Sequence, residues 1–296
     1  MENLTLNASY ELLDFENAKV QTLSLEQLER TYRENDITGQ PIKGIYHYEL
    51  IRQIQHIANM QGLEAHIDEI FAAQNRDRSE PGVVILPQIE DIYGKNAVEA
   101  HVLRRVFTNI NLKKLENEEH TANIAIAFSQ QGIEIAFGNM VKICHNQCIL
   151  GKEKYVKNYG KGKKTIQEMF DTVKKWMGAA ERTITEEREK IEEMKKIRLK
   201  PEQVLQIIGN LTAMRVAHDT SNKNIKSQND YPLNQAQISQ FTEMLLIKQF
   251  EQQYITIWDI YNTATELYKA DKMEIPNMLT QNIAMAEMVT GYIEQI

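Results

Sequence analysis

Apolar positions follow two different periods along this chain, and the changes of period predict its elements. Between residues 47 and 62 they recur every three or four positions, which predicts an amphipathic helix. The most regular alternation lies between Thr121 and Phe137, where Gly132 is placed to close a β-hairpin. A similar period of two predicts an earlier strand over 63–75. A short apolar run between Gly82 and Pro87 predicts a strand over 83–86, and the β-branched and aromatic residues of 97–112 predict a longer one.

Helical periodicity returns at Thr165, which forms a capping-box pattern with Glu168. The apolar stripe that follows predicts one long helix to about Arg198, with Gly178 as a bend. We expect its first half to cover the sheet. Its second half, residues 181–198, holds six acidic and six basic residues and is expected to project. Further helices are predicted from Pro201, over 234–250, from Thr256 and from about Pro276.

This order of elements predicts an α+β fold, in which an antiparallel β-sheet is covered by helices including one long helix. A helical C-terminal region follows the sheet. Homo-oligomerisation is expected because the long helix exceeds the sheet that it can cover. We divide the chain into an N-terminal lead-in (1–43), a helix–sheet–long-helix core domain (44–198) and a helical C-terminal region (199–296).

The composition is that of an ordinary globular protein. Of its 296 residues, 42% are hydrophobic and 25% are charged. No apolar run is long enough to span a bilayer, and the N-terminal residues lack the pattern of a signal peptide. The only cysteines are Cys144 and Cys148, so a disulfide framework does not hold the fold together. We therefore expect a cytoplasmic protein that does not contact the membrane.

Positive charge concentrates in one segment, residues 151–164, which we call the Lys/Tyr arm. The formal net charge of the chain is −7, yet the arm holds six lysines and one glutamate, a local charge of +5. Lysines can follow a phosphate backbone while tyrosines stack on bases, as in single-strand-binding proteins. A solvated loop is the alternative. The candidate nucleic-acid-binding residues are Lys152, Lys154, Tyr155, Lys157, Tyr159, Lys161, Lys163 and Lys164 of the arm, with Arg104 and Arg105 of a neighbouring strand.

The cluster from Cys144 to Cys148 shows no established catalytic or metal-binding spacing. Zinc sites use Cys-x-x-Cys pairs and four ligands, whereas here no second ligand pair is evident. We favour two buried thiols beside a strand end, with metal binding and nucleophilic catalysis as the alternatives. The segment GKGKKT at 160–165 lacks the opening glycine of a P-loop. We therefore predict no metal and no cofactor, and a protein that acts by binding rather than by catalysis.

Three segments resemble a family of phage- and plasmid-encoded proteins of unknown function, including its Bacteroidetes branch. They read GIEIAFGNMVKICHNQCIL, TIWDIYNTATELYK and NMLTQNIAMAEMVTGYI. The most specific positions are Gly138, Cys144, Asn146, Trp258 and Asn262, to which we assign a structural role; the chain departs from the family at His145 and Cys148. The resemblance implies a mobile-element protein inside a bacterial cell and implies no known activity.

Two functions are compatible with these patterns. The first is binding or annealing of single-stranded DNA through the Lys/Tyr arm, because the helix–sheet–long-helix order is similar to that of annealing proteins. The second is an interaction protein that antagonises a host defence complex. The acidic net charge and a polar loop predicted over 217–232 favour this alternative.

Overall fold

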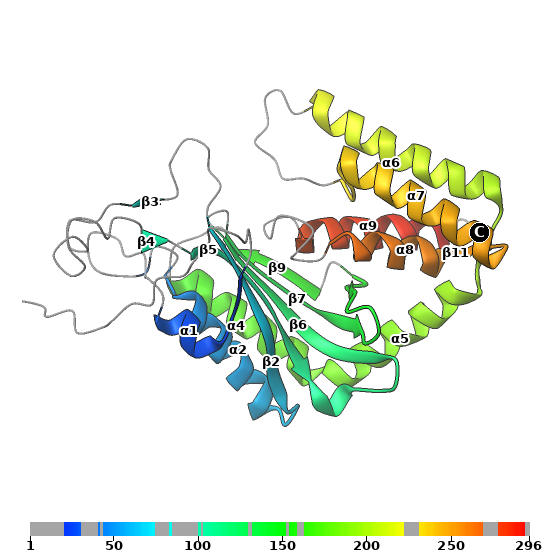
Figure 1. The fold of residues 1–296 in the computed structure, drawn as a ribbon. Coiled ribbons are helices and arrows are strands. Elements are labelled where there is room, and N and C mark those ends of the chain that lie inside the picture. Colours follow the sequence, from blue (N-terminus) through cyan, green and yellow to red (C-terminus); the bar gives the residue numbers. More distant parts are fainter. Residues whose placement is uncertain are drawn as a thin grey trace, which may run out of the picture.

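The computed structural model confirms the α+β prediction, with an antiparallel sheet, helices packed on it and a helical C-terminal region (Figure 1). The helix predicted over 47–62 and the hairpin over 121–137 are both present. Gly132 has a φ of 151° where the hairpin turns. The structure describes residues 21–30, 41, 44–74, 83–84, 100–101, 103–129, 132–151, 154–158, 163–221, 231–268 and 278–293.

The main sheet has seven strands in the order β1-β2-β5-β6-β7-β8, and β9 also pairs with β7. All of these pairings are antiparallel. A separate pair is formed by β3 (Val83–Val84) and β4 (Ala100–His101). The main strands are β1 (Gln21–Leu23), β2 (Ala65–Gln74), β5 (Leu103–Leu112), β6 (His120–Ser129), β7 (Gly132–Val141), β8 (Gln147–Cys148) and β9 (Tyr155–Asn158).

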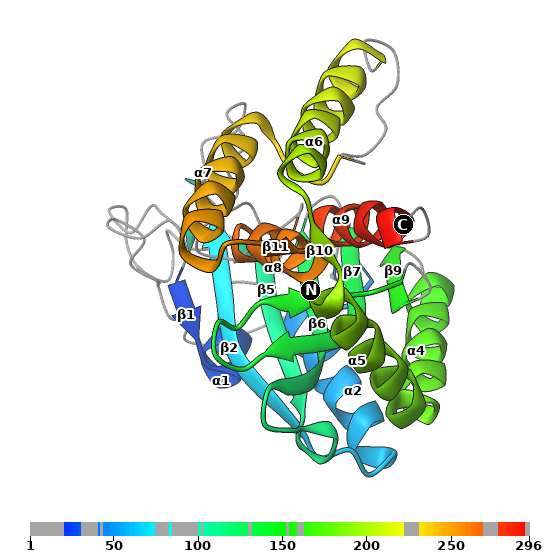
Figure 2. The ribbon, with the colours of Figure 1, turned by 90° about the vertical axis from the view of Figure 1, so that its right-hand side faces the viewer.

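One side of the sheet, which we call the first face, is apolar and fully covered. Successive side chains of a strand point to opposite faces, so Ile110, Ile124 and Ile135 share this one. They pack in one core with α2 (His47–Met60), α4 (Lys163–Gly178) and the short α1 (Leu25–Arg30). Figure 2 shows α2 and α4 on the same side of the strands. Each fully buried aliphatic side chain contributes about 1.5–3 kcal/mol to this core.

The opposite side, the second face, carries smaller side chains. Phe107 and Ala136 of this face pack against the start of α9 (Met278–Ile293). Next to α9 lies α8 (Ile257–Glu266), and both helices lie above the sheet in Figure 1. The second face is therefore covered from the C-terminal part of the chain, with small residues beneath the cover.

The predicted long helix is not one element with a projecting half. It ends at Gly178, which confirms the predicted bend, and α5 (Ala180–Lys196) continues in a new direction. Ile184 and Ile191 are buried, because α5 packs on β7 and α8. The expectation that the second half projects is therefore wrong, and the length argument for homo-oligomerisation loses its basis.

The C-terminal helices form a second layer of packing. The elements that follow α5 and have not yet been named are β10 (Arg198–Leu199), α6 (Pro201–Ser221), α7 (Gln235–Gln252) and β11 (Ile255–Thr256). A short 3-10 helix, η1 (Lys113–Leu115), lies between β5 and β6. β10 pairs with β11, which brings the start of α6 beside the start of α8. The polar loop predicted from residue 217 begins later than expected, because α6 continues to Ser221; residues 222–230 lie outside the described part. None of the described helices is long and apolar enough to cross a membrane.

Candidate functional site

The strand register aligns the side chains of the second face into rows that cross the sheet. The second and third of the three rows given below hold alanines, a glycine and three asparagines, whose side chains are shorter than the isoleucines of the first face. Space therefore remains between these rows and the helices above them. The rows are Phe71, Phe107, Ala127, Glu134 and Lys157; then Asn109, Ala125, Ala136 and Tyr155; then Asn111, Asn123 and Gly138.

That space is a cavity of about 570 Å³ between the sheet and the ends of α8 and α9, which we call the cleft. Its volume lies within the range of small-ligand sites. Phe71, Phe107 and Tyr268 give it aromatic walls. Its lining consists of Asp68, Glu69, Phe71, Phe107, Asn109, Met140, His145, Gln147, Thr265, Tyr268 and Met278.

Two amide oxygens on this face have no partner among the described residues. The side-chain oxygens of Asn109 and Asn111 are buried and accept no hydrogen bond. The Asn111 amide nitrogen donates to Asp68 at 3.4 Å, and the Asn109 amide nitrogen lies 3.9 Å from the Met140 sulfur. A buried acceptor that is left unsatisfied costs about 1–3 kcal/mol. Such a pair is therefore expected where a ligand or ordered water supplies donors.

The segment between β7 and β8, residues 142–146, closes one end of the cleft. It forms a turn in which His145 is exposed and has a φ of 56°. The turn directly follows the end of β7, so Cys144 lies beside a strand end as the sequence predicts. Beside the turn, the amides of Asn123 and Gln147 donate to each other at 2.6 and 2.9 Å.

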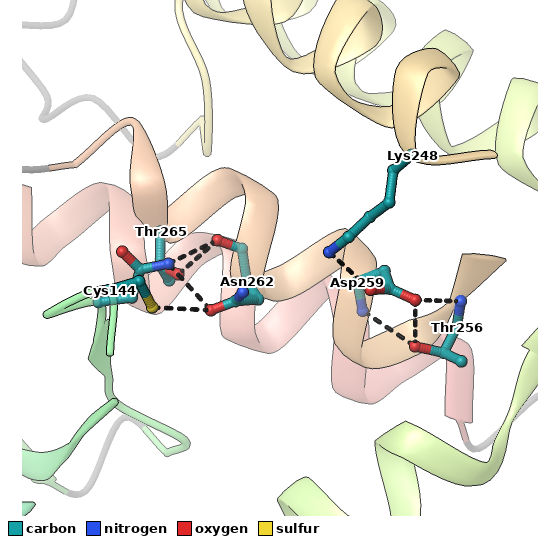
Figure 3. A network of polar contacts seen from close by, with 7 residues as sticks. Cys144, Lys248, Thr256, Asp259, Asn262 and Thr265 are labelled. Atoms are coloured by element: carbon teal, nitrogen blue, oxygen red, sulfur yellow. Dashed lines mark hydrogen bonds and ion pairs between the residues drawn. The ribbon is translucent and has the colours of Figure 1, made fainter. Parts of the chain in front are cut away.

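Three of the predicted signature residues meet at this turn, and Figure 3 labels two of them, Cys144 and Asn262. The Asn146 amide donates to the side-chain oxygen of Asn262 at 2.9 Å and to its backbone oxygen at 3.0 Å. The Cys144 sulfur lies 3.9 Å from the same side-chain oxygen. The Thr265 hydroxyl also donates to the Asn262 backbone oxygen, at 2.9 Å. These contacts fasten the turn to α8.

The other two signature residues support the same junction. A Cβ atom at Gly138 would lie 2.2 Å from the backbone oxygen of Cys148, so β8 can approach only a glycine there. Trp258 lies one turn before Asn262 on α8, with its ring 6.1 Å from that of Tyr261. The Tyr261 hydroxyl accepts from the Ile149 backbone at 2.9 Å. Gly138, Cys144, Asn146 and Asn262 thus contribute to joining the end of the sheet to α8, and Trp258 lies beside Tyr261, which bonds to the same segment.

Residues 95–289 match the family model described as a domain of unknown function (DUF932). The chain belongs to the DUF932 family. The chain has no significant match among curated proteins or among solved structures. The DUF932 match contains all five signature positions and the part of the cleft from Phe107 to Met278; Asp68, Glu69 and Phe71 lie before it.

The start of α8 is held by the capping box that the sequence predicts. In this DUF932 chain the Thr256 hydroxyl accepts from the Asp259 backbone at 3.1 Å, and the Asp259 carboxylate accepts from the Thr256 backbone at 2.9 Å. Lys248 of α7 lies 2.7 Å from the same carboxylate. Although burial opposes it, these hydrogen bonds hold the pKa of Asp259 below its usual range. The cap therefore ties α7 to α8.

Of the two cysteines, Cys148 is fully buried and Cys144 is partly exposed; both are free thiols. Burial raises the pKa of the Cys148 thiol well above its ordinary value, which disfavours the reactive thiolate. Across the described residues, no three His, Cys, Asp or Glu side chains are grouped so that they could hold a metal ion.

The Lys/Tyr arm does not present its central residues to solvent. Lys154 is 6% exposed, with its ammonium group 3.4 Å from the buried carboxylate of Glu187. Lys157 lies 2.6 Å from the Glu134 carboxylate, to which the Tyr155 hydroxyl donates at 2.9 Å. The prediction that Lys154, Tyr155 and Lys157 contact nucleic acid is therefore corrected, because these side chains bind Glu187 and Glu134 inside the protein. The acidic partners come from other elements, which charge counting along the sequence cannot reveal.

The remaining predicted binding residues are dispersed or lie outside the described part. Arg105 is buried on β5, beside Arg104 on the same strand. Lys163 and Lys164 begin α4. Lys152, Tyr159 and Lys161 lie outside the described residues.

Sequence reasoning missed the cleft. Its weak signal is the run Asn109-Ile110-Asn111, in which amides alternate with a core isoleucine on a strand that is covered on both faces. Amides facing a covered side indicate a polar site. Only the strand register shows that they lie near Asp68 of β2 and Gln147 of β8.

Proposed function

We propose that this protein binds an unpaired nucleic-acid strand, above all single-stranded DNA, and acts by that binding rather than by catalysis. The observation that carries the proposal is the lining of the cleft, which joins aromatic rings to amide and carboxylate groups. An aromatic ring that stacks on a base contributes about 1–3 kcal/mol. Amides and carboxylates bind the edges of bases that are not paired with another strand.

The proposal assigns bases and phosphates to different parts of the chain. None of the described residues that line the cleft is a lysine or an arginine, and two are acidic. Phosphates therefore stay outside the cleft, and only bases enter it. We assign the phosphate contacts to the four lysines of the arm other than Lys154 and Lys157, which pair with buried carboxylates; these four are Lys152, Lys161, Lys163 and Lys164.

The setting of this activity is also part of the proposal. The resemblance to phage- and plasmid-encoded proteins supports the proposal that this protein serves a mobile element inside the bacterial cytoplasm. Protection or annealing of the single strands of such an element requires a protein that binds single strands. The order of a helix, an antiparallel sheet and two consecutive helices supports the same assignment by analogy with annealing proteins.

Polarisation of a fluorescent single-stranded oligonucleotide tests the cleft directly. We expect wild-type protein to bind it and to be displaced more weakly by a duplex of the same sequence. Phe71→Ala is expected to weaken binding about 5- to 150-fold, the equivalent of one stacked base. The matched control is Phe170→Ala, which removes a partly buried ring from α4 on the first face. Absence of binding by the wild-type protein would refute the proposal.

A salt series tests the phosphate contacts separately. Each phosphate contact adds about 0.7 to the slope of log affinity against log salt for single strands. The triple variant Lys161→Glu, Lys163→Glu, Lys164→Glu is expected to reduce this slope by about 2. An unchanged slope would remove the arm from the binding site.

The alternative proposal is an interaction protein that antagonises a host defence complex, and one observation favours it. Large apolar side chains are exposed on α6 and α7: Leu205 is 63% exposed, Ile247 52% and Phe250 89%. Exposed apolar side chains of this size are typical of protein–protein contacts. The same surface is our proposal for homo-oligomerisation, in place of the long helix.

Analytical ultracentrifugation of wild type and Phe250→Glu distinguishes these uses of the surface. A wild-type oligomer that the variant dissociates would support homo-oligomerisation. A monomeric wild type that inhibits a purified defence complex, with inhibition lost in Phe250→Glu, would support the antagonist. A monomer without inhibitory activity would contradict both.

A further inference from the structure

The cleft is rich in hydrogen-bond acceptors, one of them without a partner among the described residues, whereas most of its side-chain donors are engaged. On the acceptor side are the carboxylates of Asp68 and Glu69 and the buried oxygen of Asn109. The oxygen of Asn111, on the same face, adds a further acceptor. The orientation of the Asn111 amide follows from its neighbour: its nitrogen must face the Asp68 carboxylate, which can only accept.

Apart from His145, which is exposed on the turn, the hydroxyl and amide donors of the described lining are engaged within the protein. The Tyr268 hydroxyl donates to the Pro232 backbone oxygen at 2.8 Å, and the Thr265 hydroxyl donates to Asn262. The Gln147 amide donates to Asn123. The hydrogen bonds of Tyr268 and Gln147 join segments that are far apart in the sequence, and that of Thr265 lies within α8. A ligand can recruit one of these donors only by breaking an internal hydrogen bond. A ligand in the cleft must therefore bring its own donors.

From this imbalance we infer that the cleft selects bases that carry an exocyclic amino group and discriminates against thymine and uracil. The inference rests on the proposed function. Cytosine offers an amino group at N4, adenine one at N6, and guanine a ring N–H beside its amino group. Thymine offers a single ring N–H between two carbonyl oxygens.

Cytosine and thymine are the sharpest comparison, because both are pyrimidines of similar size and stacking surface. Both bases present two acceptor atoms, N3 and O2 in cytosine and O4 and O2 in thymine, but the cytosine amino group carries two N–H donors whereas thymine has one. Thymine would therefore satisfy fewer of the cleft's acceptors. Each unsatisfied buried group costs about 5- to 150-fold in affinity. We therefore expect the full chain to bind oligo-dC on the order of tenfold more tightly than oligo-dT of equal length.

The experiment is a competition in which unlabelled oligo-dC and oligo-dT displace the same labelled mixed-sequence strand from the full-length protein. Two variants test the acceptors: Asp68→Asn replaces acceptor capacity by a donor, and Asn109→Leu removes the amide. Both are expected to reduce the dC/dT affinity ratio toward one. Glu181→Gln, an exposed substitution on α5, is the control for lost negative charge and is expected to keep the ratio.

The possible outcomes separate this inference from the proposed function. Equal affinities for dC and dT, or a preference for dT, would overturn the selectivity while leaving single-strand binding intact. No displacement by either oligonucleotide, with no binding of the labelled strand, would overturn both. A dC preference that persists in Asp68→Asn and in Asn109→Leu would also overturn the inference, because the selectivity would then arise elsewhere.

Discussion

The two faces of the sheet are made by the same strands, yet they serve different purposes. On β5, Ile110 is completely buried in the first core, while its neighbour Asn109 faces the cleft with an oxygen that accepts no hydrogen bond among the described residues. The first face is filled by packed apolar side chains, whereas the second face carries polar side chains and a cavity. Stability and the proposed ligand binding are thus separated by the direction in which alternate side chains of the strands point.

A buried ion pair beside the sheet also serves stability. Glu187 of α5 is fully buried and holds together three segments: its carboxylate accepts from the Leu150 backbone at 2.7 Å and from Asn139, and it pairs with Lys154. Burial raises the pKa of Glu187, and Lys154 opposes that shift. The lysine that resembles a nucleic-acid contact in the sequence is therefore a structural residue.

The largest effect is expected from Lys154→Met. The substitution leaves the Glu187 carboxylate buried without its cation, and such losses cost about 3–5 kcal/mol of the free energy of unfolding. Urea denaturation measures this change. The double variant Lys154→Met, Glu187→Gln replaces the unpaired carboxylate by a neutral amide and is expected to recover part of the lost free energy of unfolding. A single variant as stable as wild type would show that Lys154 is available for a ligand after all.

Ile110→Ala tests the first face. Removing this fully buried side chain from the core between β5 and α2 is expected to cost about 2–5 kcal/mol, the sum of lost transfer energy and the cavity left behind. Thermal unfolding followed by circular dichroism measures the loss. Nucleic-acid affinity, measured at a temperature where the variant is folded, is expected to be unchanged.

A smaller, pH-dependent effect is expected from His120, at the end of the first face. Burial lowers the pKa of His120, helped by Lys195 and Arg188 and opposed by Glu119 and Glu192. The unfolded chain therefore binds a proton more readily, so the contribution of His120 to stability is lost as pH falls below about 6.5. In a urea series from neutral to acidic pH, His120→Gln is expected to show a shallower loss than wild type. Parallel profiles would contradict this assignment.

Asn109→Ala is expected to have the smallest effect on stability, below about 1 kcal/mol, because the amide oxygen that it removes has no partner in the described structure. Denaturation of Asn109→Ala beside Ile110→Ala compares adjacent residues on opposite faces. A loss as large as that of Ile110→Ala would remove the distinction between the faces.

Much of the fold follows from local patterns. The helix over 47–60, the β6–β7 hairpin and the capping box at Thr256 are each specified by residues close together in the sequence. The signature residues Cys144, Asn146 and Asn262 were also named from the sequence, although their contact across 116 or more positions was not. Local spacing determines which element forms, because backbone hydrogen bonding and side-chain period act over a few residues.

Local patterns in the sequence predict the α+β class and the alternation that gives the sheet two faces. The packing of distant segments determines which face holds the cleft and which lysines pair with buried carboxylates. The physical reason is distance along the chain: Lys154 meets Glu187, and Asn111 meets Asp68, only after strands and helices far apart in sequence have packed. The sequence shows which residues are charged or polar, whereas packing determines which groups they contact.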